Sequence, residues 1–141
     1  MYMQSLSTQM EESMKIKRCI VALLLLAILY LQFGRAPYIN VSAIKKHTDG
    51  YVLELTITTN KLFIIDKDLY AKSLIEKVLE NDFKNMKFPY DELGHPKELR
   101  IKVYTNSIAR LYDTSSFEIH YNTYLDEIKI ISREQSHLQR L

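Results

Sequence analysis

The feature that most constrains this chain is an uninterrupted apolar segment near its amino terminus, Cys19 to Leu31, with the sequence CIVALLLLAILYL. A helix satisfies its own backbone hydrogen bonds, and this one has no polar stripe that could face water, so lipid is its most favourable surrounding. Lys15, Lys17 and Arg18 precede the segment, as basic residues do in export signals. The pattern therefore predicts a membrane-inserted helix. The alternative is a helix buried in a soluble core.

The length of the segment leaves two fates open. Residues 19–33 form about 22 Å of helix, which is shorter than a hydrocarbon core of ~30 Å and typical of a cleaved signal peptide. However, the small residues nearest the end of the segment, Gly34 and Ala36, are followed by Pro37, which we expect to obstruct a peptidase. Flanking basic side chains can also snorkel while the bilayer thins locally. We predict a retained anchor over residues 19–34, with secretion after cleavage as the alternative.

Basic residues also predict the orientation of the anchor. Lys15, Lys17 and Arg18 lie on its amino-terminal side, whereas Arg35 is the one basic residue close to its other end. The side richer in basic residues stays in the cytoplasm. We therefore expect residues 1–18 to form a short basic cytoplasmic tail of a single-pass protein of the cell membrane, with the remainder of the chain outside the cytoplasm.

Glycine and cysteine usage excludes several classes of site. The three glycines, Gly34, Gly50 and Gly94, are too far apart for a phosphate-binding loop or a dinucleotide fingerprint. The single cysteine, Cys19, has no partner for a disulfide or a zinc site. We predict no cofactor and no structural metal.

The charge of the chain after the apolar segment is nearly balanced. Its basic residues number sixteen, the chain's 19 less Lys15, Lys17 and Arg18; its acidic residues number fifteen, the chain's 17 less Glu11 and Glu12. Binding to a phosphate backbone needs clustered positive charge, so we do not expect a nucleic-acid partner.

Residues 38–133 have the periodicity of an α+β domain. Ile39, Val41 and Ala43 alternate with polar neighbours, a turn follows at residues 47–50, and alternation resumes from Tyr51 to Ile57. This pattern predicts a β-hairpin with Ile39, Val41 and Ala43 on one face.

The rest of this domain predicts one helix and further strands. Leu62 to Ile65 could add a short strand, and Asp66 or Asp68 could cap an amphipathic helix running to about Phe83. Three alternating runs then indicate an antiparallel meander: Leu99, Ile101 and Val103; Phe117, Ile119 and Tyr121; Ile128 and Ile130. The predicted architecture is an antiparallel sheet with one packed helix, β-β-(β)-α-β-β-β. We expect residues 134–141 to form a loosely ordered polar tail.

The candidate binding surface is the polar side of the meander. With Leu99, Ile101 and Val103 turned toward the helix, the opposite face carries the predicted site residues Arg100, Lys102, Tyr104, Glu118 and His120. Arginine and tyrosine are enriched where proteins bind proteins. The main hypothesis is thus a membrane-tethered, extracytoplasmic protein-binding or accessory module without catalytic activity. The same side chains would also suit an ordinary solvated sheet face.

Two other functions stay open. The loop FPYDELGHP brings Asp91, Glu92 and His95 together in sequence, so they could serve a small secreted metal-dependent hydrolase or form a solvated turn. Alternatively the chain is a structural subunit of a membrane complex that associates through the anchor, whose small residues are Ala22 and Ala27.

Overall fold

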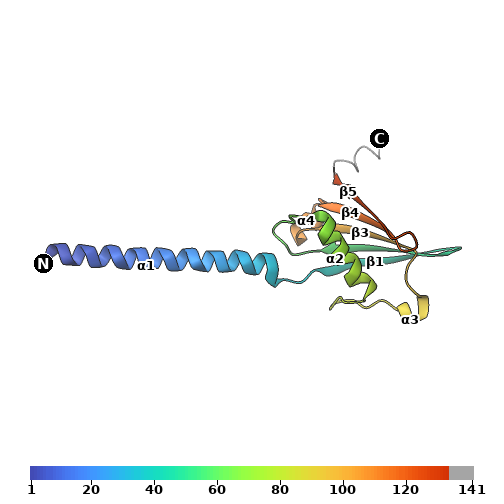
Figure 1. Cartoon of the computed structure of the whole chain (residues 1–141), viewed down its shortest axis with the longest axis horizontal. Helices are drawn as coiled ribbons and strands as arrows, with labels where there is room; N and C mark the ends of the chain where they lie inside the picture. The colour runs from blue at the N-terminus through green and yellow to red at the C-terminus, as the bar shows by residue number, and fades with distance from the viewer. Residues whose placement is uncertain (134–141) are drawn as a thin grey trace. The chain divides into compact units, whose positions relative to one another are not determined.

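A computed structural model describes residues 1–133, so the predicted tail at 134–141 lies outside the described residues. The chain divides into two compact units, Met1–Gly34 and Arg35–Leu141, whose elements are labelled in Figure 1.

The first unit is a single long helix. Helix α1 spans Tyr2–Leu29 and continues as a π-helical turn, η1, at Tyr30–Gly34. The side chains of α1 are all exposed, and α1 with η1 is the one helix among the described residues that is long and apolar enough to cross a bilayer. Residues 2–18, predicted as a tail, are thus a helical continuation of the apolar segment. The helix is compatible with a membrane anchor or a signal sequence.

The second unit is a five-stranded sheet with helices, which confirms the α+β class. The strands follow the order of the chain across the sheet and are β1 (Tyr38–His47), β2 (Gly50–Thr58), β3 (Glu98–Tyr104), β4 (Phe117–Asn122) and β5 (Glu127–Ser132). The meander of β3, β4 and β5 is antiparallel, as predicted, but β2 and β3 are parallel. The sheet is therefore mixed, because the helix between β2 and β3 carries the chain back to the end at which β2 began.

The hairpin of β1 and β2 is confirmed, but the prediction for one face of β1 is wrong. The register shifts between Ile39 and Val41, so Ile39 pairs with Ile57 whereas Val41 pairs with Thr56. The extra residue, Asn40, is a β-bulge, and its side-chain amide donates to the hydroxyl of Thr58 at 2.7 Å. A bulge reverses the alternation beyond it, so Val41 and Ala43 lie on the face opposite Ile39.

The predicted short strand at Leu62 to Ile65 is also wrong, because these residues form a loop. Asn60, with a positive φ of 56°, turns the chain away from the sheet directly after β2. Two short helices were not predicted: α3 (Tyr90–Leu93) and α4 (Ser107–Leu111).

Helix α2 spans Lys67–Leu79 and begins as predicted, with the carboxylate of Asp66 accepting a hydrogen bond from the backbone N–H of Leu69 at 3.0 Å. It ends before the predicted Phe83 because Asn81 adopts a left-handed conformation, with φ of 59°. The N–H of Asn81 donates to Val78 O at 3.1 Å, and that of Asp82 donates to Lys77 O at 2.8 Å. This pair of bonds is a Schellman motif, which satisfies the last carbonyls of a helix.

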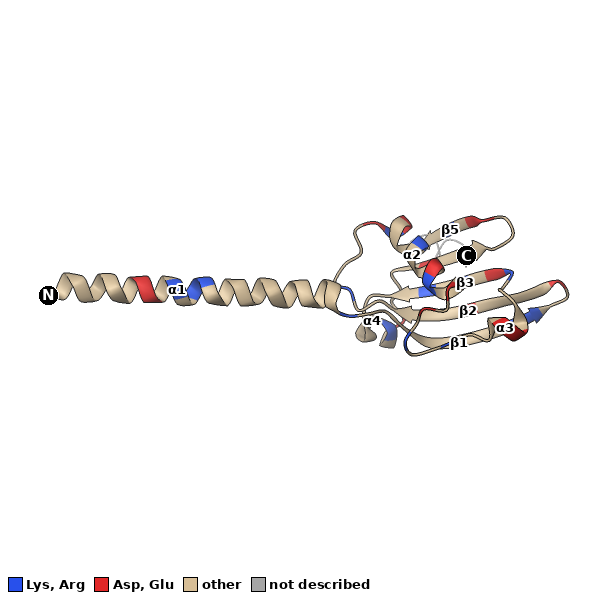
Figure 2. Cartoon of the chain, turned by 60° about the horizontal axis from the view of Figure 1, so that its bottom comes forward, with Lys and Arg blue, Asp and Glu red and all other residues tan. Residues whose placement is uncertain are grey.

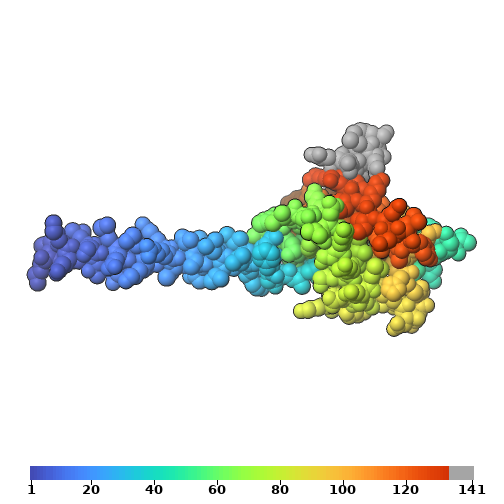
Figure 3. Space-filling model, viewed as in Figure 1, coloured from blue at the N-terminus to red at the C-terminus, as the bar shows by residue number. Residues whose placement is uncertain are grey.

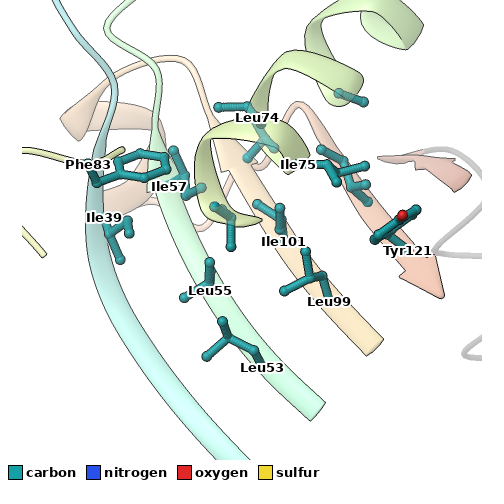
Figure 4. Packing of buried hydrophobic residues seen from close by; sticks show 14 of the residues in the cluster. Ile39, Leu53, Leu55, Ile57, Leu74, Ile75, Phe83, Leu99, Ile101 and Tyr121 are labelled. Atoms are coloured by element: carbon teal, nitrogen blue, oxygen red, sulfur yellow. The ribbon is translucent and has the colours of Figure 1, made fainter. Parts of the chain in front are cut away.

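The core lies between α2 and one face of the sheet (Figure 4). The predicted face of the helix is buried: Ala71, Leu74, Ile75 and Val78 are each at most 4% exposed. They pack against the alternate side chains of the strands, among them Leu53, Leu55, Ile57, Leu99, Ile101, Val103, Phe117 and Ile119. Burying a leucine or isoleucine side chain contributes about 1.5–3 kcal/mol, so this one-sided core is what holds the sheet to its helix.

Candidate functional site

Because α2 covers one face of the sheet (Figure 3), the side chains that point to the other face form a separate surface. We call it the open face. The strand register places its residues in rows: Glu54, Arg100 and His120 lie opposite one another on β2, β3 and β4, as do Thr56, Lys102 and Glu118. A shallow groove of about 370 Å³ runs over these rows, and it also contacts Val41 and Ala43 of β1.

Four of the five predicted site residues are brought together in this groove: Arg100, Lys102, Glu118 and His120. Their side chains keep between 29% and 45% of their exposure. The alternation of the sequence predicted this grouping. Residues two apart on one strand point to the same face of the sheet, and so do the residues that pair with them on the neighbouring strand.

The fifth predicted residue, Tyr104, lies on the same face but is only 3% exposed. Its hydroxyl donates to a carboxylate oxygen of Asp113, and the ammonium of Lys102 binds the same oxygen at 2.9 Å. Burial, followed by the hydrogen bond to Asp113, raises the pKa of Tyr104, while the hydrogen bond to Asp113 raises that of Lys102. Tyr104 is therefore not among the residues that line the groove, and it offers a partner little surface.

Arg100 is held in place by two carboxylates of the open face. Its Nε donates to Glu98 Oε1 at 2.8 Å, and its Nη1 lies 3.8 Å from Glu54 Oε1. The same Glu54 oxygen accepts from Lys45 at 2.9 Å. The hydrogen bond from Arg100 lowers the pKa of Glu98, so the pair is charged at neutral pH. Arg100 is thus oriented in the middle of the groove, with 45% of its side chain exposed.

Glu118 and His120 are less constrained. Within residues 1–133, the one charged-group contact of Glu118 is with His120 Nε2 at 3.9 Å, and it is an ion pair only when the imidazole is protonated. That distance is beyond hydrogen-bond range. The carboxylate and the imidazole are therefore both open to an additional hydrogen-bonding partner.

The sequence analysis missed the contribution of the first two strands to the groove. Glu54 and Thr56 alternate with Leu53, Leu55 and Ile57, and this alternation could have assigned them to the open face. Val41 could not have been assigned in this way, because the bulge at Asn40 sets its direction. Figure 2 shows acidic and basic residues intermixed over the strands.

The loop with Asp91, Glu92 and His95 does not assemble a site for a metal ion. Asp91 and Glu92 are exposed on α3, while the ring of His95 stacks on Tyr90 with centroids 4.8 Å apart. His95 Nε2 also lies 3.3 Å from the carbonyl oxygen of Leu79. Across residues 1–133 no three His, Cys, Asp or Glu side chains are grouped closely enough to hold a metal ion.

No protein-family model, curated protein or solved structure matches the chain.

Proposed function

We propose that this protein is a membrane-tethered module outside the cytoplasm that binds another protein through the open face of its sheet and has no catalytic activity of its own. The observation that carries the proposal is the groove, which joins an oriented guanidinium, a carboxylate, an imidazole and the apolar side chains of Val41 and Ala43 on a face that α2 leaves uncovered. Such mixed surfaces suit polypeptide partners, since they supply both apolar area and directional hydrogen bonds.

The tether supports a binding role. Confining a module to a membrane raises its effective concentration toward partners in the same membrane, so that a small contact area suffices. The exposed apolar surface of α1 and the basic residues Lys15, Lys17 and Arg18 favour an anchor with the second unit outside the cytoplasm.

Site-specific photo-crosslinking in intact cells tests the binding surface. A photoreactive phenylalanine analogue replaces Thr56 in the groove or, as the control, Glu76 on the exposed side of α2. We expect a discrete crosslinked product from position 56 only, and we expect its loss in the Arg100→Glu variant but not in Lys72→Glu. Equal products from positions 56 and 76, or an unchanged product in Arg100→Glu, would contradict the proposal.

The tether is tested separately by the amino-terminal sequence of the mature protein and by protease digestion of intact cells. A retained segment 19–34 together with digestion of the second unit from outside supports an anchored, extracytoplasmic module. A new amino terminus after residue 34 would instead identify a secreted protein.

A further inference from the structure

Exposed apolar side chains gather at one end of the sheet. We call it the Tyr38 end, because Tyr38, Thr58 and Tyr104 are aligned there by the strand register. Two segments project at this end, the loop from β2 into α2 and helix α4 (Figure 2). The most exposed apolar side chains of this loop, of the first turn of α2 and of α4 with its C-cap residue are Ile65 at 87%, Leu69 at 66%, Ile108 at 69%, Leu111 at 80% and Tyr112 at 74%.

The position of these side chains is unusual for a soluble surface. Single exposed apolar residues are common, but five on the segments at one end of the sheet indicate a surface that meets something apolar. Phe63 and Leu62, in the same loop, are a further 52% and 47% exposed.

The polypeptide joins the sheet at this same end. The guanidinium of Arg35 donates to Asn60 O at 3.2 Å, and the side-chain amide of Asn60 donates back to Ala36 O at 3.1 Å. The hydroxyl groups of Tyr38 and Ser107 share a hydrogen bond of 3.0 Å. The residues at the start of β1 and just before it are therefore hydrogen-bonded both to the loop before α2 and to α4.

The short stretch of chain between the membrane segment and Arg35 indicates what these side chains contact. Arg35 follows Phe33, the last apolar residue of the membrane segment, by two residues, which span at most about 7 Å. The polar headgroup layer is about 5–8 Å thick on each side of the hydrocarbon. In a bilayer that holds residues 19–33, Arg35 and the Asn60 backbone bound to it are consequently within the headgroup layer.

We propose that Ile65, Leu69, Ile108, Leu111 and Tyr112 form a membrane footing, a set of side chains that insert into the headgroup layer of the bilayer crossed by α1. Aliphatic and tyrosine side chains with basic neighbours are the residues that favour this layer. Lys61, Lys67 and Arg110 are the basic neighbours here. The inference rests on the proposed anchor and adds to it a second contact with the same membrane.

The opposite end of the sheet supplies the control for this inference. The strands run from the Tyr38 end to the turn between β4 and β5, which carries Tyr124 and Leu125. Tyr124 is 71% exposed, so a label at this position reports on the end of the sheet away from the proposed footing.

Spin labels on the full-length chain in nanodiscs of zwitterionic lipid, at one copy per disc, test this inference. Cys19→Ala removes the native thiol, and single cysteines are placed by Leu111→Cys, Ile65→Cys, Tyr124→Cys and Leu25→Cys. Power saturation then compares collisions of each label with oxygen, which partitions into lipid, and with a water-soluble nickel chelate. All four positions are exposed, so the label does not disturb the core.

We expect labels at 111 and 65 to lose collisions with the nickel chelate relative to the label at 124, and to gain collisions with oxygen. Nickel accessibility at 111 and 65 equal to that at 124, with a lipid-embedded label at 25, would overturn the footing and leave the anchor intact. A label at 25 that is fully accessible to nickel would overturn both. Loss of both oxygen and nickel collisions at 111 would indicate a contact with protein and would also overturn the footing.

Discussion

The side-chain amide of Asn85 forms two hydrogen bonds with the backbone of Ile39, Nδ2 donating to the carbonyl at 2.7 Å and Oδ1 accepting from the N–H at 3.2 Å. Ile39 lies on β1, at the edge of the sheet, where one side of the strand has no neighbouring strand among the described residues. Asn85 thus takes the place of a pairing strand at that point and closes the edge beside the bulge.

Replacing Asn85 should therefore weaken the fold. The Asn85→Ala variant loses both hydrogen bonds to Ile39, and we expect the free energy of unfolding to fall by about 1–2 kcal/mol, since Asn85 is itself exposed. Urea denaturation of the fragment Arg35–Leu141, which has its own core, measures the change. The adjacent exposed residue supplies a control, Lys84→Ala, which should change stability by less than 0.5 kcal/mol, about the limit for a surface site. Equal effects of the two variants would show that the Asn85 bonds contribute little.

Asn81 offers a test that separates backbone strain from hydrogen bonding. Its φ is 59°, and its side chain both accepts from Phe88 N at 2.7 Å and donates to Phe88 O at 2.8 Å. Asn81→Gly keeps the conformation but loses the two bonds, whereas Asn81→Ala loses the bonds and adds a left-handed penalty of roughly 1–2 kcal/mol. We expect alanine to destabilise the fragment more than glycine does, as measured by thermal or urea unfolding. The reverse order would argue against the Schellman ending of α2.

The ion pair between Arg100 and Glu98 predicts a pH dependence. Because Arg100 lowers the pKa of Glu98 below its unfolded value of 4.5, the pair stabilises the fold above that pH, and the contribution is lost as the pH falls through the lower folded-state pKa. In Arg100→Gln the pKa of Glu98 should rise, which a carboxyl NMR titration of the fragment records directly. Lys45→Gln removes an ion pair with Glu54 instead, so it should leave the pKa of Glu98 unchanged. An unmoved Glu98 in Arg100→Gln would mean that the hydrogen bond is absent in solution.

Tyrosine burial predicts the opposite behaviour in alkali. Burial raises the pKa of Tyr70 to about 12 from an unfolded value of 10, so above pH 10 the unfolded chain releases a proton that the folded chain still holds. The free energy of unfolding should then decline as the pH rises from about 10 to 12. Tyr70→Phe should reduce this slope, whereas Tyr112→Phe, at an exposed position, should not. Urea midpoints at a series of alkaline pH values give the slope, and identical slopes for both variants would refute the assignment to Tyr70.

The parts of the fold that sequence analysis predicted correctly depend on neighbours in the chain. Helix α2 was recognised because Ala71, Leu74, Ile75 and Val78 repeat at helical spacing, and the hairpin because a turn separates two alternating runs. The direction of β3 relative to β2 depends on how the chain crosses over through α2. The periodicity of the residues within each element does not determine this direction. The bulge at Asn40 escaped notice because Ile39, Val41 and Ala43 alternate in sequence whether or not one residue is left unpaired.

The candidate site was predictable to the same extent. Arg100 and Lys102 alternate with buried residues of β3, and Glu118 and His120 alternate with those of β4, so their common face followed from the strand period. The burial of Tyr104 could not be predicted from the strand period, because it depends on the turn after α4. In that turn Asp113 has a positive φ of 51°, and its carboxylate accepts a hydrogen bond from the tyrosine hydroxyl.

The parallel pairing of β2 with β3 has a consequence for how the protein is made. A two-residue turn lets the β1–β2 hairpin form within microseconds of its synthesis, whereas β3 can join only after all of α2 and the α3 loop have left the ribosome. Until then Leu53, Leu55 and Ile57 have no cover. The half-synthesised chain, rather than the finished domain, is accordingly the species most prone to aggregate and the one a chaperone would bind.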